Sequence, residues 1–393
     1  MARTVQIAGT AMTPMNRRDL SAEEMTHQVV RGALTDARVG PEEIGLVVFA
    51  NATAGRLLDQ QCIRGQAFLR SAGFRHAGVV NVDNSCAGGA SALHLSTLAA
   101  RGGTGHVLAV GIEKMWTGDR AATLAGIEDG VPMVDRTALH RDLENPSGSV
   151  LMGLNARWAA SYLEERGATL EQVAAATVKA RRHGSLNPNA QFQSEVTVEQ
   201  VLTSATIVTP LTRLMCSSFT DGAAAAVLTA QPLVGAPRIR STTARSGGGE
   251  VDYHERLTEA ASAAWDESSV DPSEIDVVEL HDATSPEELY ALESLGFFKP
   301  GDAGPATLAG DTTLGGDKAT VNPSGGLVSR GHPLAATGIA QVVELAAQLR
   351  GAGGARQVDG ARLAMATNTG GMIGTDGGTT DAAFIGIHVL EAG

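Results

Sequence analysis

Residues 86–111 read CAGGASALHLSTLAARGGTGHVLAVG, and residues 332–367 read HPLAATGIAQVVELAAQLRGAGGARQVDGARLAMAT. Each stretch predicts a helix that begins at small residues, continues with apolar residues at helical spacing, stops at glycine and is followed by a buried strand. When the two helix starts are aligned, Cys86 falls opposite Ala335, three residues after His332. This correspondence predicts a duplicated α/β unit.

A second pair of stretches, residues 21–51 and 257–282, supports the duplication. Both predict an amphipathic helix, then a turn that reads PEEI or PSEI, then a buried strand. Helices that alternate with short buried strands are typical of parallel βαβ units. We therefore expect two similar halves, packed as layers about a pseudo-twofold axis, with catalytic residues where strands end and helices begin.

Residues 118–210 do not fit this repeat. The segment is polar and loop-rich around DRTALHRDLENPSGS, and two helical stretches follow. We interpret it as an inserted loop domain, a lid over the active face of one half. The predicted division is a first half made of residues 1–117 and 211–245, the insertion at 118–210, and a second half at 246–393.

Composition narrows the class of protein. The 393 residues carry a net charge of −13 without a run of Lys and Arg, so neither nucleic acid nor an anionic membrane is expected as the main partner. The chain starts without a signal-like sequence and lacks an apolar run of about 18 residues, so we expect a cytoplasmic protein. Its three cysteines are Cys62, Cys86 and Cys216, and they form no CxxC pair. We therefore expect no disulfide framework and no metal site.

Cys86 stands at the predicted strand-to-helix junction. There its sulfur would lie near unpaired N–H groups and the positive end of the helix dipole, which predicts a stabilised thiolate and a lowered pKa. Residues 87–90 are small, so a substrate carbonyl could approach both the sulfur and backbone donors, as covalent acyl transfer requires. The local pattern alone equally fits a small buried apolar residue.

Two histidines favour the catalytic interpretation. His281 follows the strand IDVVEL, at its carboxyl end, and His332 lies in the glycine-rich stretch directly before the second half's helix. Each histidine alone is compatible with a structural role. Because the duplication places both at the same edge of the fold as Cys86, the three side chains together predict an active site.

The same residues resemble the thiolase superfamily, and most closely its sterol-carrier-protein-2-type thiolases. The resemblance runs in order over essentially the whole chain. It rests on NSCAGGASAL (84–93), GIEKM (111–115), NPNAQFQ (187–193), SFTDGAAAAVL (218–228), IDVVELHDATSPEELYALESLGF (275–297) and NPSGGLVSRGHPLAATG (322–338). It implies the five-layered thiolase fold, α-β-α-β-α, built from two βαβαβαββ halves.

The resemblance also implies the site residues. Cys86 takes the acyl group as a thioester, His332 activates that cysteine, and His281 helps to hold the thioester oxygen of the second substrate. Asn322, of the NPSGG block, orients a water or His332, and Gly371, of the NTGG block (368–371), belongs to the same oxyanion-binding and orienting group.

The implied ligand is an acyl thioester of coenzyme A or of an acyl-carrier protein, bound as substrate and not as a resident cofactor. The resemblance further implies a homodimer or homotetramer. Met152 either lines the acyl pocket or packs in the core. Arg182 and His183, in the KARRH stretch at a predicted helix end, either meet the phosphates of coenzyme A or belong to a solvated helix terminus.

The chain departs from the family pattern at the second catalytic cysteine, which acts as acid and base. The two blocks that supply it in relatives read NTGG (368–371) and HDAT here, with Ala283 at the cysteine position of the second block. A Cys-His-His set remains, as in decarboxylating ketosynthases, which need no strong base. We predict an acyltransferase of lipid or secondary metabolism that transfers an acyl group, or forms or cleaves a C–C bond, through acyl-Cys86.

Three alternatives stay open. The first is a conventional 3-ketoacyl-CoA thiolase in which Asp282, Thr284, Ser285 or a water replaces the missing cysteine. The second is a retro-aldol lyase acting on a side-chain acyl-CoA with a small OB-fold partner protein; the aldolases that resemble this chain carry tyrosines at the positions of His281 and His332. The third is a non-catalytic scaffold subunit that supports a sister ketosynthase.

Overall fold

In the computed structural model, which describes residues 3–16, 19–143, 148–374 and 380–393, the strands fall into two groups of five with the same pairing order. The first group contains β1 (Val5–Met12), β2 (Ile44–Ala50), β3 (Gly78–Val82), β4 (His106–Glu113) and β7 (Gly222–Thr229), in the order β3-β2-β4-β7-β1. The second contains β8 (Arg238–Arg245), β9 (Val277–Glu279), β10 (Thr320–Val321), β11 (Leu363–Gly374) and β12 (Thr380–Glu391), in the order β10-β9-β11-β12-β8. Each strand has a counterpart at the same place in the other group, so the predicted duplication is confirmed.

The direction of the strands repeats as well. In the first group β2 is parallel to β3 and β4, while β7 is antiparallel to β4 and β1. In the second group β9 is parallel to β10 and β11, while β12 is antiparallel to β11 and β8. The groups join where Val5 pairs with Ile239 and Gln6 with Arg238, which makes one continuous ten-stranded sheet.

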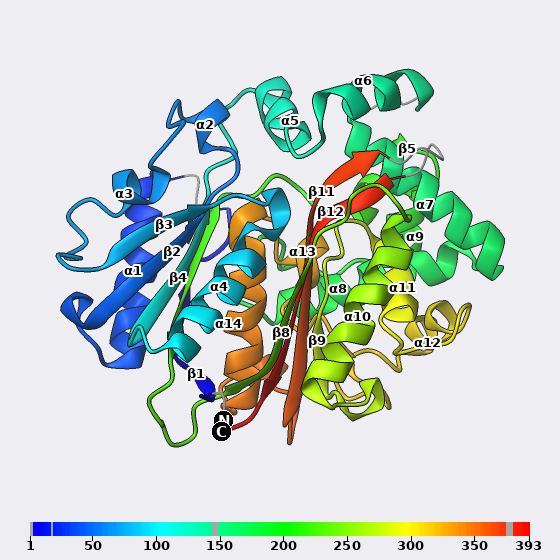
Figure 1. Cartoon of the computed structure of the whole chain (residues 1–393). Coiled ribbons are helices and arrows are strands. Elements are labelled where there is room, and N and C mark those ends of the chain that lie inside the picture. The colour runs from blue at the N-terminus through cyan, green and yellow to red at the C-terminus, as the bar shows by residue number, and fades with distance from the viewer. Residues whose placement is uncertain (1–2, 17–18, 144–147, 375–379) are drawn as a thin grey trace.

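Helices complete five layers (Figure 1). The middle layer holds α4 (Gly88–Gly102) and α14 (Thr337–Leu349), between the two groups of strands. The outer layers include α1 (Ala22–Ala37) on one side, and α8 (Leu170–Ser185), α10 (Tyr253–Ser268) and α11 (Ser285–Ser294) on the other. The mixed α/β thiolase-type architecture expected from the sequence is therefore present.

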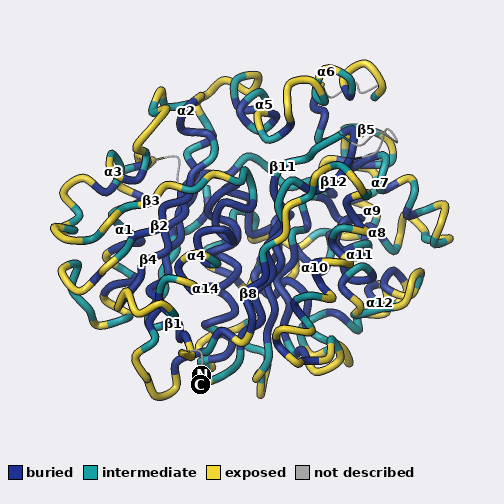
Figure 2. Tube along the Cα trace, viewed as in Figure 1, coloured by how far each residue is buried: buried dark blue, intermediate teal, exposed yellow. Residues whose placement is uncertain are grey.

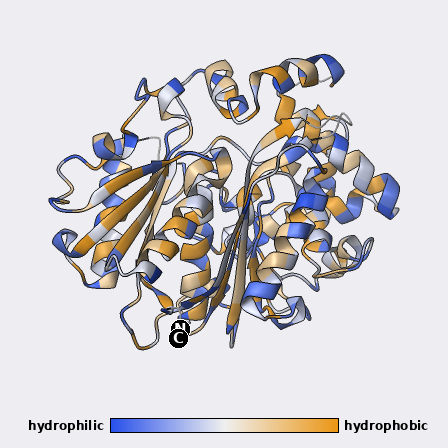
Figure 3. Cartoon of the chain, viewed as in Figure 1, coloured by the Kyte–Doolittle hydropathy of each residue, from blue (hydrophilic) through white to orange (hydrophobic). Residues whose placement is uncertain are grey.

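The two middle helices touch through small residues. A Cβ atom on Gly338 would lie 2.5 Å from the amide nitrogen of Ala90, and one on Gly89 would lie 2.7 Å from the carbonyl oxygen of Ala335. Only glycine permits so close an approach of two backbones. Both helices are buried along most of their length (Figure 2), and Figure 3 shows apolar residues concentrated in the first group of strands.

Shorter elements connect these layers. They are α2 (Ala54–Leu57), α3 (Arg64–Phe68), α9 (Val198–Thr203), β5 (Thr206–Val208), β6 (Leu211–Thr212), α12 (Ala303–Ala309) and α13 (Gly326–Ser329). Among the helices of the described residues, none combines the length and the apolar character needed to cross a membrane.

The insertion at 118–210 is more helical than predicted. Its two predicted helical stretches are α7 (Val150–Arg166) and α8, and it also contains α5 (Arg120–Glu128), α6 (Met133–Asp142) and the short α9. The polar stretch read as a loop is largely α6, whose sequence hides the helix because Leu139 is its one buried residue. Residues 144–147 of that stretch lie outside the described residues.

The predicted boundary between residues 245 and 246 is also displaced. β8 pairs along its length with β12, and only at its first two residues with β1, so it is a strand of the second group. The second half therefore begins at Arg238. The repeat used in the sequence comparison started at residue 257, one strand too late to locate this boundary.

Candidate active site

Cys86 lies in the 3₁₀ turn Ser85–Ala87, between β3 and the start of α4. The equivalent turn in the second half is Leu334–Ala336, and its middle residue is Ala335, as the alignment of the two helix starts predicted. β11 passes close beneath the cysteine turn: a Cβ on Gly370 would lie 2.1 Å from the carbonyl oxygen of Asn84. Gly370 thus lets the strand support the turn that presents the sulfur.

His332 is held by the helix that follows it. Its Nδ1 lies 2.8 Å from Oγ1 of Thr337, and that hydroxyl donates its own proton to the carbonyl oxygen of Pro333 at 3.3 Å. The hydroxyl must then accept a hydrogen bond from Nδ1–H of His332. This assignment leaves Nε2 with a lone pair, which is the form that can take a proton from a thiol.

His281 is held in the opposite tautomer. The side-chain amide nitrogen of Asn368, on β11, lies 2.7 Å from Nδ1 of His281. An amide nitrogen only donates, so Nδ1 accepts and the ring proton resides on Nε2. His281 can therefore donate a hydrogen bond to an oxygen that gains negative charge.

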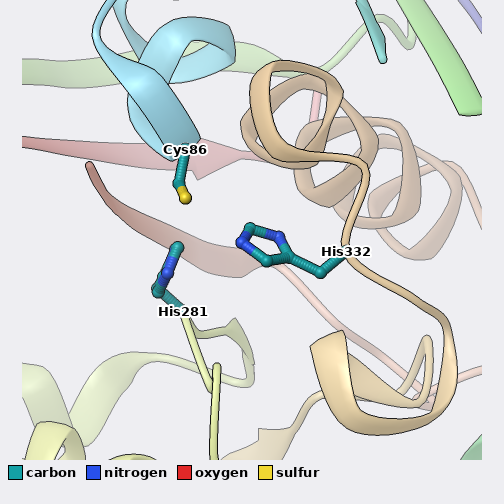
Figure 4. Close-up of side chains that lie close together, drawn as sticks. All are labelled: Cys86, His281 and His332. Carbon is teal, nitrogen blue, oxygen red and sulfur yellow. The ribbon is translucent and has the colours of Figure 1, made fainter. Parts of the chain in front are cut away.

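The three side chains point into one space (Figure 4). The rings of His281 and His332 are nearly perpendicular, with their centroids 5.1 Å apart. Ligand atoms of Cys86, His281 and His332 all lie within 4.8 Å of one another. Cys86, His281 and His332 thus come together in one site, while their catalytic roles stay a prediction.

The same proximity could hold a metal ion, because sulfur and imidazole nitrogen are ligands that zinc prefers. Spacing along the sequence gave no sign of this, since the three residues come from distant segments. That the protein uses no metal remains a prediction.

The charge state of the site differs from the prediction. Burial raises the pKa of Cys86 to about 12, although Ser85 donates a hydrogen bond to its sulfur. Burial also lowers the pKa of His281 to about 3 and lowers that of His332 well below 6.5. These shifts favour a neutral thiol and neutral imidazoles, whereas the sequence predicted a thiolate, because desolvation penalises the charged form of each group.

The lowered pKa of His281 makes stability depend on pH. Between pH 6.5 and about 3 the folded protein keeps His281 neutral while the unfolded chain protonates it. The stability that this difference contributes is present above pH 6.5, and the free energy of unfolding falls as the pH falls through this range. We expect His281→Asn to reduce the slope of the free energy of unfolding against pH by about 1.4 kcal/mol per pH unit, which corresponds to one proton. Urea unfolding of both proteins at pH 7.0, 6.0 and 5.0 measures the difference. Equal slopes would show that His281 titrates alike in the folded and unfolded chains.

A buried ion pair joins the segments that carry the histidines. Arg330 Nη1 lies 3.1 Å from Oε2 of Glu279, and both side chains are fully buried. Glu279 stands two residues before His281, and Arg330 two residues before His332. Ser324 donates to Glu279 through both its amide and its hydroxyl group. The pair thereby links the two segments that carry the imidazoles.

Asn322 has other partners than those expected. Its Oδ1 accepts a hydrogen bond from the amide of Leu280, and its Nδ2 donates to Glu288. Both polar groups of the side chain are thus occupied away from His332. Asn322 therefore holds the backbone of Leu280, the residue before His281, and does not orient His332. Gly371, in contrast, lines the cavity at φ 70°, where a side chain would be strained.

The Cys86 cavity has a volume of about 570 Å³ and a largely apolar lining. Residues from α5, α7 and α8 cover it, and Met152 is among them, as one of its two predicted roles requires. Arg182 is exposed outside the cavity lining, whereas its neighbour Arg181 lines the cavity and stacks on Phe192 at 4.5 Å.

His183 is not available to a coenzyme A phosphate. It is buried, with Nδ1 3.0 Å from the carbonyl oxygen of Asn322 and Nε2 3.0 Å from Oγ1 of Thr313. Burial lowers the pKa of His183 to about 3, so the ring is neutral. Helical periodicity predicts that residues 181, 182 and 183 face different directions. The run of three basic residues does not itself show which of them faces the cavity.

The proposed substitutes for the second cysteine are turned away from the cavity. Asp282 accepts a hydrogen bond from the amide of Leu327, and the hydroxyl of Thr284 donates to Asn155. Ser285 is bonded to Thr177 and to a backbone carbonyl. Ala283 itself lines the cavity, so a methyl group stands at the position where the resemblance implies a cysteine.

Comparison with known proteins identifies the family. Residues 5–232 match the family described as "Thiolase, N-terminal domain", and residues 250–379 match "Thiolase C-terminal domain-like". The chain belongs to the thiolase family. The matched ranges leave residues 233–249, which contain β8, between them.

Several thiolase-family relatives cover nearly the whole chain. An acetyl-CoA acetyltransferase of Methanothermobacter thermautotrophicus is 35% identical, over 95% of this chain and 98% of that protein. The benzoylsuccinyl-CoA thiolase subunit BbsB of Thauera aromatica is 32% identical, over 94% and 96%. Sterol carrier protein 2 of Homo sapiens is 32% identical, over 94% of this chain and 70% of that protein. The function is thus of the thiolase, acyltransferase-like kind.

A solved structure has the same fold at lower sequence identity. The Ltp2-ChsH2(DUF35) aldolase superposes with a TM-score of 0.78, covering 99% of this chain and 98% of its own, at 22% identity. This similarity establishes the shared fold and nothing about the reaction.

Proposed function

We propose that this chain is a thiolase-type acyltransferase that works through acyl-Cys86 and forms or cleaves a C–C bond next to a thioester. The observation that carries the proposal is the convergence of Cys86 with two imidazoles in opposite tautomers on one apolar cavity. A single buried cysteine would need neither partner.

Each tautomer fits one step. The Cys86 sulfur attacks the thioester carbonyl while its proton passes to the lone pair on Nε2 of His332. His332 then returns that proton to the leaving thiol. In the second half-reaction, Nε2–H of His281 donates to the oxygen of the second thioester, where negative charge develops. Coenzyme A or a carrier protein supplies the thioester as substrate.

Nothing in the site favours the alternatives of an aldolase or a scaffold subunit. The nucleophile and both imidazoles are in place, and an inert subunit would not require them. The conventional thiolase alternative depends on a substitute base.

Intact-protein mass spectrometry tests the proposal directly. The protein is incubated with acetyl-, propionyl-, octanoyl-, benzoyl-, succinyl- and malonyl-CoA, and with the same groups on a carrier-protein phosphopantetheine. We expect at least one thioester to add its acyl mass to a peptide that contains Cys86. An unmodified protein with every thioester would refute the proposal.

We also propose a homodimer formed through the edge strand β3. This strand ends the sheet, so its outer backbone groups are free to pair with another strand. Val80 is 46% exposed beside α4, where Leu95 and Leu98 are 40% and 46% exposed. Such an edge with adjoining apolar side chains suits a second copy related by a twofold axis.

Light scattering tests the dimer. We expect the protein to have twice the monomer mass of 40.4 kDa, and Leu98→Glu to convert it to the monomer, because a charge would be buried at the interface. Val234→Glu is the control, since Val234 is exposed in the β7–β8 connection. A monomeric wild-type protein would contradict the proposal.

A further inference from the structure

The cavity holds a titratable side chain that the steps above do not use. Glu287 lies in the first turn of α11, four residues after Ala283, and lines the same cavity. It is the single carboxylate among the described residues of the lining. A carboxylate can take a proton from carbon or from a thiol, which the methyl group of Ala283 cannot do, and the carboxylate of Asp282 lies outside the cavity lining.

One oxygen of Glu287 is anchored, and the other is buried without a hydrogen-bond partner among the described residues. Oε2 lies 3.2 Å from Nε2 of His254, whereas Oε1 has no hydrogen-bond partner within the described part of the chain. The side chain is only 4% exposed. A carboxylate that merely braced a helix would have both oxygens bonded, because a buried unpaired oxygen is costly. The free oxygen therefore calls for a ligand or a reaction.

The anchoring residue is itself rigid. The ring of His254 stacks on Tyr290 with centroids 3.4 Å apart, and it meets Trp158 and Tyr253 edge to face. Such packing leaves the ring no other orientation, so it fixes the direction of Glu287. Precise orientation is what a general base requires.

The wall that carries Glu287 is continuous with the wall behind Cys86. The hydroxyl of Tyr253 lies 3.1 Å from Oγ1 of Thr369, the residue after Asn368, which holds His281. Burial raises the pKa of Tyr253 well above 10, and the neighbouring Glu287 and Cys86 raise it further. Tyr253 thus lies within electrostatic range of both the carboxylate and the nucleophile.

We propose that Glu287 is the general base of the second half-reaction, a catalytic residue that takes the place of the cysteine replaced by Ala283. This inference rests on the proposed acyl-Cys86 function. It would make condensation and thiolysis available without loss of carbon dioxide.

In the proposed second half-reaction, Glu287 first accepts a proton and later returns it. Oε1 of Glu287 takes a proton from the α-carbon of the second thioester, so that a C–H bond breaks, an O–H bond forms and the electron pair moves into an enolate. His281 donates a hydrogen bond to the enolate oxygen. The enolate carbon attacks the acyl carbonyl on Cys86, the C–S bond breaks, and the departing thiolate receives the proton held by Glu287.

Exchange of α-protons measures this step apart from acylation. Among the thioesters that carry a hydrogen on the α-carbon, the one that acylates Cys86 most completely is incubated with protein in D₂O, and mass spectrometry follows deuterium in the free acyl-CoA. We expect Glu287→Gln to lower exchange at least about 100-fold, the usual contribution of a general base, and to change acylation of Cys86 less than threefold. Glu287→Asp, which keeps the carboxylate, should retain measurable exchange. Glu171→Gln is the control, an exposed carboxylate in the first turn of α8.

Each other outcome has a definite meaning. Wild-type exchange in Glu287→Gln, or acylation of the wild-type protein without any α-exchange, overturns the role of Glu287 and leaves the acyl-Cys86 function standing. Equal loss of acylation and exchange would make Glu287 a substrate anchor or a structural residue, which also overturns the inference. Failure of all thioesters to acylate Cys86 removes the proposed function itself.

Discussion

Cys86→Ala is expected to abolish covalent acylation and to lower acyl transfer at least about 10⁴-fold, because removal of an enzyme's nucleophile removes the intermediate and not just one contact. A labelled acyl group should appear on the wild-type protein and not on the variant. Intact-mass spectra and peptide mapping after incubation with the reactive thioester measure this. The change replaces one side chain at the cavity and adds no bulk.

Cys62→Ala is the matched control. Cys62 is exposed and lies outside the lining of the cavity, so its loss should leave acylation unchanged. Cys216 lines the cavity, but its sulfur donates to the carbonyl oxygen of Thr212 and burial raises its pKa to about 12. A Cys86→Ala protein that still carried the label would move the nucleophile elsewhere, and Cys216 would be the first residue to examine.

In the proposed mechanism, the neutral resting thiol gives His332 its role as base. A cysteine that was already ionised could attack without a base, but burial holds Cys86 as a thiol. Its reactivity then depends on proton transfer to Nε2 of His332, whose orientation Thr337 sets. The apolar cavity therefore protects the nucleophile until a thioester and the base are both in place.

Much of the fold was predictable because the same pattern of helices and strands occurs twice in the sequence. The alignment that set Cys86 opposite Ala335 started from the small residues at the two helix starts, and Gly89 and Gly338 among them let the two middle helices approach. His281 and His332 could be found for the same reason, since parallel strands bring their carboxyl ends to one edge. Local patterns were sufficient wherever the chemistry follows the backbone.

The rest depends on contacts between distant segments. Glu287 is adjacent in sequence to Glu288, which forms a buried ion pair with Lys179, and no pattern distinguishes the two carboxylates. Only the packing of α10 against α11 turns one toward the cavity and the other toward the core. The pKa of Cys86 has the same origin, because desolvation is a property of the packed site and not of the helix start.

Arg330→Met is expected to destabilise the protein by about 3–5 kcal/mol, the usual cost of removing one partner from a buried ion pair. The change leaves the carboxylate of Glu279 buried without its cation, and it keeps an apolar side chain of similar length. Burial raises the pKa of Glu279 to about 7, and Glu344 adds to the shift. Because the loss of Arg330 would raise it further, the full cost of the unpaired carboxylate is expected at alkaline pH and is smaller wherever Glu279 takes up a proton. Urea unfolding followed by circular dichroism gives the free energy of unfolding.

Two further proteins separate the charge effect from simple loss of packing. Arg141→Met removes an exposed arginine next to Asp142, and such surface pairs contribute less than about 1 kcal/mol. The double variant Glu279→Gln with Arg330→Met removes both charges, and should recover at least about 1 kcal/mol relative to Arg330→Met alone, because no buried charge remains unpaired. If Arg330→Met were as stable as Arg141→Met, the pair would contribute nothing to the fold. The spacing of His281 and His332 would then have to be set by the neighbouring hydrogen bonds of Thr337 and Asn368 alone.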